Sequence, residues 1–468
     1  MTDTDLCFTP AIELRSLIAT KELSPVELMD AVLSRAEALQ PTLNAFCTET
    51  FDAARDGAKA SAERVAAGEP KGPLEGIPVT IKDLTFTKGV RTMAGSHIYA
   101  DRVPDEDAPL VERLRDAGGI SLGKTTVPEG GWIGCGDSPL TGTTHNPWKH
   151  GYNAGGSSSG AAACTAAGIG PLHQGSDGAG SIRMPSAFCG VYGIKPSFGR
   201  VPLLPISNNE FNSHAGPMTR TVADAALMLG VMAGPEYRDF SSLEGQPADY
   251  LGELEAGIAG LKVAFSPDLG YLKVDEEVAA PVRDAVAAFS DLGCHVEEVG
   301  KLWDDPIEME HCYWSTAFAG NYGNYIETYG ERMDPGLLAC IEAGMRYSAA
   351  EFVRFRQQRL DFAREVQDFF HEYDLLLTPS LSVAAFPVGR IIPEHWEQHD
   401  WDWLRWAGFS YPFNLSWVPA ATCPCGFTEN GLPVGLQIVG GRFQDLRVFQ
   451  ASRAFETARP WAAHRPPV

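Results

Sequence analysis

The segment YNAGGSSSGAAAC, residues 152–164, places three serines between a glycine pair and a run of alanines. Small side chains let backbone segments approach one another closely. The hydroxyl groups at the start of the segment can either cap a helix or transfer a proton. Residues 141–200 share this texture, being rich in Gly and Ser with few charges. We therefore expect a closely packed functional site in this part of the chain.

Helix and strand patterns alternate on both sides of this block. Ser24-Pro25-Val26-Glu27 matches a capping box with proline at the first helical position, which predicts a helix to about Gln40 that Pro41 ends. The apolar, β-branched run GIPVTIKDL (76–84) predicts a buried strand with Lys82 near its end.

The same alternation continues along the chain. DAPLVERLRDAGG (107–119) predicts a helix, and ISLG (120–123), GLKVAFSPD (260–268), YDLLLTPS (373–380) and GLPVGLQIVG (431–440) predict strands. No internal repeat is present. The sequence therefore predicts an α/β fold: one large α/β/α layered domain over residues 1–468, with a central mixed β-sheet covered by helices and a polar surface excursion at about 231–257.

The composition of the chain limits the classes of molecule that it is expected to bind. The chain of 468 residues has 37 basic and 60 acidic side chains, a formal net charge of −23 that opposes nucleic-acid binding. No run of eighteen apolar residues and no secretory signal pattern is present, so we expect no membrane partner and a cytoplasmic protein. The ten cysteines are scattered, and Cys423 and Cys425 lack the further ligands of a zinc site. We expect no metal and no cofactor.

Two short motifs point to functions that their context contradicts. GGISLGKT (118–125) matches the phosphate-loop pattern, but a helix precedes it and Pro128 follows, so a nucleotide-binding protein is the weaker alternative from another class. Gly156, Ser158 and Gly160 match the nucleophile-elbow pattern of α/β-hydrolases. The preceding HGYNAG (150–155) does not read as a strand, and no downstream histidine stands out.

A serine and a lysine far apart in the sequence offer a different chemistry. In SDGAGSIRMPSAFCG (176–190), Ser181 follows small residues whose backbone N–H groups can gather around an oxyanion. The serine lacks a neighbouring histidine as a base. Burial would lower the pKa of Lys82 and make a neutral amine accessible, although a strand-end lysine paired with Asp83 explains the same residue.

Six segments together resemble the amidase signature family of serine hydrolases. In chain order they are GIPVTIKD, LRDAGGISLGKT, GTTHNPW, AGGSSSGAAA, GAGSIRMPSAFCGVYGIKPSFGR and GLPVGLQIVG. The resemblance covers nearly the whole chain, with residues 70–230 as the signature core. It implies an amidohydrolase with a Ser, cis-Ser, Lys triad that cleaves amides through an acyl-enzyme.

The resemblance assigns roles by position. Ser181 matches the nucleophile, Lys82 the base, and Ser157 the bridging serine, whose peptide bond with Gly156 is expected to be cis. Ser158 is expected to hydrogen-bond within the site, with Asp177 and Arg183 supporting the turn. The predicted oxyanion hole consists of the backbone N–H groups of Gly178, Ala179, Gly180 and Ser181.

Substrate preference is expected to depend on the segments in which this chain departs from the family pattern. Many members of the family have Thr-Gly-Gly-Ser where this chain has Gly-Ala-Gly-Ser at residues 178–181. This variant resembles the corresponding turn of nylon-oligomer cyclic-amide hydrolases. Trp132 and Cys135 are predicted pocket walls. The region 300–420 is the predicted variable substrate-pocket region, and its aromatic residues gather at 311–325 and 394–413. Four tryptophans from Trp396 to Trp406 read as a lid or rim.

The predicted substrate is a small neutral hydrophobic or aryl amide, with esters, carbamates or hydrazides as side substrates. No arginine stands out as a carboxylate clamp. The alternative within the family is the glutaminase subunit of a tRNA-dependent amidotransferase, and the resemblance also makes a homodimer possible.

Overall fold

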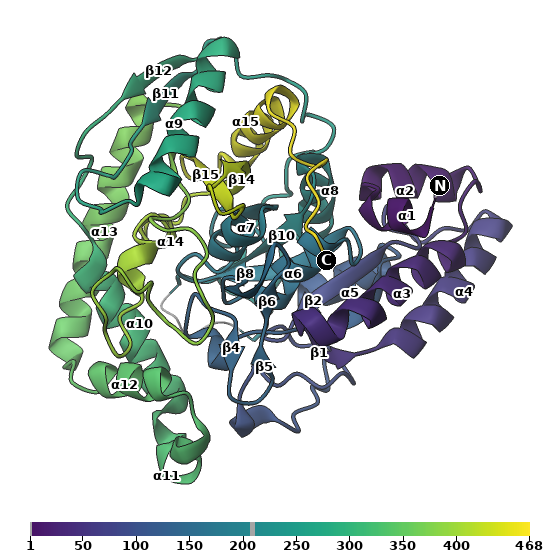
Figure 1. Ribbon diagram of the computed structural model, residues 1–468, viewed down its shortest axis with the longest axis horizontal. Helices are drawn as coiled ribbons and strands as arrows, with labels where there is room; N and C mark the ends of the chain where they lie inside the picture. Colours follow the sequence, from purple (N-terminus) through teal and green to yellow (C-terminus); the bar gives the residue numbers. More distant parts are fainter. Residues whose placement is uncertain (1, 206–210) are drawn as a thin grey trace.

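The computed structural model describes residues 2–205 and 211–468 and has an eleven-stranded mixed sheet at its centre (Figure 1). Strands from both halves of the chain share this sheet, which supports the predicted single domain. In spatial order the strands are β1 (Phe46–Glu49), β3 (Ile120–Thr125), β2 (Pro78–Lys82), β8 (Leu172–Asp177), β10 (His214–Thr219), β9 (Tyr192–Lys195), β14 (Ala420–Phe427), β15 (Pro433–Gly440), β13 (Leu375–Pro379), β11 (Lys262–Phe265) and β12 (His295–Glu298).

Strand direction brings distant side chains to one edge of the sheet. β2 runs parallel to both β3 and β8, and β11 runs parallel to β12 and β13; the other neighbouring pairs are antiparallel. Because β2 and β8 are parallel neighbours, Lys82 and Asp177 at their carboxyl ends lie at the same edge. The functional site lies at this edge.

Helices flank the sheet, as predicted. In Figure 1, α3–α5 lie beside the N-terminal strands, α9 and α15 lie beside the C-terminal strands, and α10, α12 and α13 form the green outer part. The longer helices are α2 (Ala11–Ala19), α3 (Pro25–Leu43), α4 (Phe51–Ala67), α5 (Pro109–Asp116), α6 (Ser159–Ala167), α8 (Val222–Met232), α9 (Glu276–Asp291), α10 (Ile307–Tyr322), α12 (Pro335–Gly344), α13 (Ala349–Glu372) and α15 (Asp445–Ala458).

The remaining elements are short. They comprise the helices α1 (Asp3–Phe8), α7 (Arg183–Cys189), α11 (Ile326–Tyr329) and α14 (Pro412–Leu415), the two-stranded sheets β4 (Asp137–Ser138) with β5 (Gly142–Thr143) and β6 (His145–Asn146) with β7 (Lys149–Asn153), and the 3-10 turns His97–Tyr99, Glu129–Gly131, Gly323–Tyr325, Gly330–Arg332 and Leu404–Ala407. Across the described residues, every helix is too short or too polar to cross a bilayer.

Most predicted elements are confirmed, with two local corrections. The Ser24–Glu27 capping box starts α3, but Pro41 lies inside its last turn. The helix ends at Leu43, and its C-cap Asn44 has a left-handed backbone with φ of 49°. Residues 149–153 form strand β7, contrary to the reading of HGYNAG. This strand pairs with β6 outside the central sheet, so it is not the strand that a nucleophile elbow requires.

The predicted surface excursion joins α8 to β11 without a helix or strand of its own between residues 233 and 261. Tyr237 and Phe240 are largely exposed in this segment, whereas Tyr250, Leu254 and Ile258 are buried against the main hydrophobic core. The second half therefore packs into the core, while Arg238 in the first half forms an ion pair with Glu112 of α5.

The tryptophans of the 394–413 segment form a core, which corrects the prediction of a lid or rim. Trp403 and Trp406 are fully buried, and Trp396 and Trp401 pack against the same hydrophobic cluster. The ring of Trp406 stacks on Phe188, with ring centroids 5.8 Å apart, and its Nε1 donates to the Ile391 carbonyl at 3.0 Å. Phe188 belongs to α7, so this core supports the helix that follows Ser181.

We expect Trp406→Ala to lower the free energy of unfolding by roughly 3–5 kcal/mol, because it leaves a cavity that the surrounding side chains cannot fill. Urea denaturation followed by circular dichroism measures the change. A shift below about 1 kcal/mol would favour the rim that the sequence suggested.

Candidate active site

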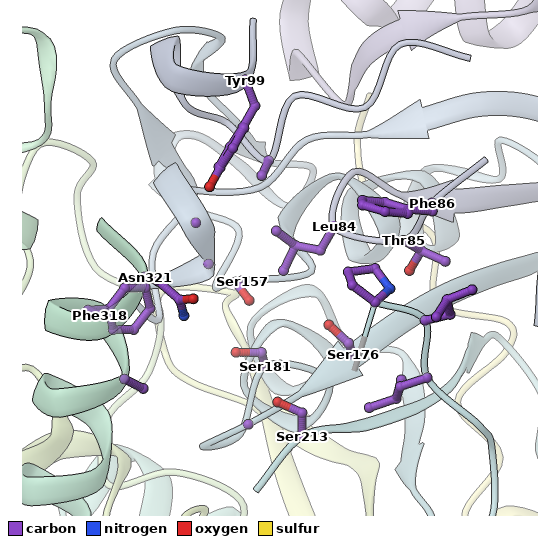
Figure 2. A pocket seen from close by; sticks show the side chains of 18 of the residues that line it. Leu84, Thr85, Phe86, Tyr99, Ser157, Ser176, Ser181, Ser213, Phe318 and Asn321 are labelled. Carbon is purple, nitrogen blue, oxygen red and sulfur yellow. The ribbon is translucent and has the colours of Figure 1, made fainter. Parts of the chain in front are cut away.

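A cavity of about 390 Å³ opens at the carboxyl end of β2 and β8. Ser157 and Ser181 both line it, although each is only 3% exposed (Figure 2). Its wall is otherwise largely apolar and aromatic. The remaining described lining residues are Leu84, Thr85, Phe86, Ala94, Tyr99, Arg102, Leu110, Gly130, Gly131, Ser176, Gly178, Leu203, Leu204, Pro205, Ser213, Trp314, Ala317, Phe318, Asn321 and Tyr322.

Lys82 ends β2 behind the cavity wall and is fully buried. Its Nζ atom lies 2.9 Å from Ser157 Oγ, 2.8 Å from Ser158 Oγ and 3.1 Å from the Ser176 carbonyl oxygen. Burial lowers the pKa of Lys82 to about 7, against the opposing effect of the Asp177 carboxylate. Asp83 points elsewhere and accepts from the Met93 N–H, so the simple pairing of Lys82 with Asp83 is absent.

The loop that carries Ser157 is held close to another backbone segment. The Gly156–Ser157 peptide bond is cis. A Cβ at Gly156 would lie 2.4 Å from the Cys135 carbonyl oxygen, so only glycine fits there. The Ser158 N–H donates to the Ser181 carbonyl at 3.2 Å and links this loop to the turn that carries Ser181.

The Ser181 turn is held by a buried ion pair. Asp177 accepts from Arg183 Nη2 at 2.9 Å and from Nε at 3.0 Å, and both side chains are fully buried. Although burial alone raises it, the pKa of the Asp177 carboxyl lies well below its ordinary value because of Arg183. Asn414 of α14 also donates to Asp177 Oδ1, at 2.9 Å. This network ties the turn between β8 and α7 to α14, which is distant in the sequence.

One predicted oxyanion donor is already occupied. The Gly180 N–H donates to Asp177 Oδ1 at 2.7 Å, which is at odds with a role toward an oxyanion. The N–H groups of Gly178, Ala179 and Ser181 have no hydrogen-bond partner in the described parts of the chain. Gly180 has φ of 118°, and a Cβ there would lie 2.5 Å from Ser410 Oγ. Glycine is therefore required at this bend for both conformation and space.

The predicted pocket walls Trp132 and Cys135 lie behind the cavity. Both are buried, and neither is among the described residues that line it. The preceding Gly130 and Gly131 reach the cavity instead. The carbonyl of Trp132 accepts from Trp314 Nε1 and Trp403 Nε1, so this loop is anchored to the aromatic core. Of the aromatic residues in 311–325, α10 presents Trp314, Phe318 and Tyr322 to the cavity.

The phosphate-loop pattern has a structural role. Lys124 lies within strand β3 and is fully buried, with its Nζ donating to the Thr85 carbonyl and to Thr87 Oγ1. A phosphate-binding loop would instead lead from a strand into a helix N-terminus. The nucleotide-binding alternative is therefore wrong.

Several residues around the site, among them Asn414 and Arg102, were not predicted from the sequence. Asn414 lies in the short helix α14, whose sequence matches no known motif. Arg102 lies in a loop and lines the cavity. Neither carries a local signal, because each meets the site through contacts with segments that are distant in the sequence.

Comparisons with known proteins cover the whole chain. A family model described as Amidase matches residues 27–449. An acylamidase from Rhodococcus erythropolis is 41% identical, over 100% of this chain and 98% of that protein. A glutamyl-tRNA(Gln) amidotransferase subunit from Synechococcus sp. (strain CC9605) is 34% identical, over 97% of this chain and 96% of that protein.

Solved structures agree with this fold over the same length. A bacterial aryl acylamidase of the amidase signature enzymes is 31% identical and superposes with a TM-score of 0.90, covering 98% of this chain and 99% of that one. A 6-aminohexanoate cyclic dimer hydrolase solved with substrate is 26% identical, with a TM-score of 0.89 and the same coverage. On this evidence the chain belongs to the amidase signature family.

Proposed function

We propose that this amidase cleaves carboxylic amides through an acyl-enzyme on Ser181, with Ser157 as the proton relay and Lys82 as the base. The observation that carries the proposal is the 2.9 Å contact between Lys82 Nζ and Ser157 Oγ, made by a fully buried lysine whose pKa is lowered to about 7. A serine hydroxyl needs such a base to attack a carbonyl carbon at neutral pH.

The contacts of Lys82 support transfer of a proton from the Ser157 hydroxyl to the lysine amine. A neutral amine has two hydrogens and one lone pair. The two hydrogens are matched by Ser158 Oγ and the Ser176 carbonyl oxygen, which are both acceptors within 3.1 Å. The lone pair is then left to accept the hydroxyl hydrogen of Ser157. Ser158 thus orients the amine and does not itself react.

The proposed reaction has two steps. As Ser181 Oγ bonds to the amide carbon, its proton passes to Ser157, and the Ser157 proton passes to Lys82. The N–H groups of Gly178, Ala179 and Ser181 stabilise the oxyanion, while the Gly180 N–H holds the Asp177 carboxylate. As the C–N bond breaks, Ser157 gives a proton to the departing amine and regains one from Lys82. Water then attacks the ester carbonyl as its proton passes through Ser157 to Lys82. The proton returns through Ser157 to Ser181 as the acyl bond breaks and the acid is released.

The cavity wall supports a hydrophobic or aryl amide as substrate. Leu84, Phe86, Trp314 and Phe318 supply apolar and aromatic surface around the serines. The names of the matched acylamidase and aryl acylamidase favour the same class. Esters, carbamates and hydrazides with similar side groups are the expected side substrates.

The glutaminase alternative is less supported. Free glutamine carries an α-ammonium group, which a site normally binds with a carboxylate. No aspartate or glutamate is among the described residues that line the cavity. The acylamidase also matches this chain at higher identity than the amidotransferase protein does.

We expect kcat/KM to rise with pH and to level off above a pKa of about 7, since the neutral form of Lys82 is the active one. Below that pKa the rate constant falls about tenfold per pH unit. Asp177 stays ionised throughout because its pKa lies well below the range. Release of para-nitroaniline from para-nitroacetanilide between pH 5.5 and 9 measures the profile, with circular dichroism to verify folding. A flat profile would contradict the assignment of Lys82.

The cytoplasmic location and the homodimer remain predictions. Light scattering after size-exclusion chromatography tests the second.

A further inference from the structure

Arg102 is a charged side chain in the wall of the cavity. Among its described lining residues, Arg102 is the only one that is ionised at neutral pH, and none is acidic. The protein as a whole carries a formal net charge of −23, so a cavity with a positive wall differs from the average surface. The cavity therefore has a charge preference of its own.

Arg102 is held rigidly on this wall. Its guanidinium carbon lies 4.2 Å from the ring centroid of Tyr99 and 5.1 Å from that of Phe86, both of which also line the cavity. Its Nε donates to the Thr92 carbonyl at 2.8 Å. Figure 2 shows the Tyr99 and Phe86 side chains on the wall across from Ser181. A guanidinium fixed in this way loses little conformational freedom when it binds a ligand.

The two terminal nitrogens of Arg102 are left for a ligand. Within residues 2–205 and 211–468, no carboxylate pairs with Arg102, and Nη1 and Nη2 donate no hydrogen bond. Burial lowers the pKa of Arg102, but a guanidinium stays charged at neutral pH. Arg183, by comparison, forms a buried ion pair with the Asp177 carboxylate. A partly buried cation whose terminal nitrogens make no hydrogen bond is costly, and a carboxylate that binds them through two parallel hydrogen bonds would relieve that cost.

We infer that Arg102 is a specificity-determining residue that binds a carboxylate on the substrate, at the end remote from the scissile amide. The inference rests on the proposed function, which it deepens: the body of the substrate stays hydrophobic or aryl, while its far end is anionic. The cavity then favours amides that end in a carboxylate and rejects those that end in an ammonium group. This inference replaces the wholly neutral substrate expected from the sequence with one that has an anionic end group.

Two series of matched amides test this preference and identify the side of the amide that carries the carboxylate. The acyl series comprises the para-nitroanilides of glutaric, pentanoic and ω-aminopentanoic acids. The amine series comprises para-acetamidobenzoate, para-methylacetanilide and para-(aminomethyl)acetanilide. Within each series the end group changes from anionic to neutral to cationic at nearly constant shape.

In at least one series we expect kcat/KM for the anionic member to exceed that for the cationic member by about tenfold or more. Arg102→Gln should reduce this ratio by about tenfold while changing the neutral member by less than about threefold. Arg91→Gln removes a charge from an exposed position on the same segment and should leave the ratio unchanged.

Binding of the same compounds to Ser181→Ala, measured by calorimetry, separates charge selection from chemistry. Tighter binding of the anionic member to Ser181→Ala supports the role of Arg102. If the wild type hydrolyses none of the compounds, that result counts against the proposed function and leaves the role of Arg102 in binding unaffected. Two results would overturn the inference. If the ratio of kcat/KM between the anionic and cationic members is unchanged in Arg102→Gln, Arg102 does not contact the end group. If kcat/KM falls equally for all three members, the role of Arg102 is merely structural.

Discussion

Ser181→Ala is expected to lower kcat/KM by roughly 10⁵-fold, because it removes the hydroxyl that is proposed to form the acyl-enzyme. The variant should also resist covalent labelling by a fluorophosphonate, which requires an activated serine. Release of para-nitroaniline and intact-protein mass spectrometry measure the two effects. In the wild type, peptide mapping should place the label on Ser181.

Ser159→Ala is the matched control for this experiment. Ser159 is buried close to the same loop, and its Oγ has no hydrogen-bond partner in the described structure. We expect this variant to keep both turnover and labelling. Labelling of another serine in the wild type, or full turnover in Ser181→Ala, would refute the assigned nucleophile.

Lys82→Met is expected to lower kcat/KM by roughly 10³–10⁴-fold, since it removes the base that contacts Ser157 while nearly keeping the side-chain volume. The inflection of the pH profile near 7 should vanish with it. Steady-state rates across the pH range test both expectations. Ser157→Ala should cause a similar loss, and the double variant should lose little more than either single variant, because the two groups act as one relay.

Lys124→Met controls for the removal of a buried lysine. Lys124 lies on the neighbouring strand β3 and contacts Thr85 and Thr87, away from the serines. The change should lower the stability of the protein yet keep the pH inflection near 7. An inflection that survives in Lys82→Met would show that another group titrates.

Local sequence predicted most of the framework of the site. The capping box at Ser24 and Glu27 starts α3 as expected, and GIPVTIKDL forms the buried strand β2 that ends at Lys82. The glycine and serine spacing led to the family, and thus to the residues proposed for catalysis. These features depend on neighbours along the chain, through caps, turn geometry and the alternation of apolar side chains.

Other features of the site depended on contacts that no local pattern encodes. Trp403 and Trp406 read as a rim, yet they are buried because α7 and the Trp132 loop pack against them. The Gly180 N–H was predicted to face an oxyanion, but it binds the Asp177 carboxylate in the folded turn.

By itself the sequence determined the α/β elements, the family and the residue types available for catalysis, because backbone preferences and small-residue spacing act over short distances. Only the tertiary structure decided which groups meet: Lys82 reaches a serine 75 positions away, and Arg102 lies against Tyr99 and Phe86 on the cavity wall. Burial, hydrogen-bond partners and the resulting pKa values arise from segments that are brought together only when the chain folds.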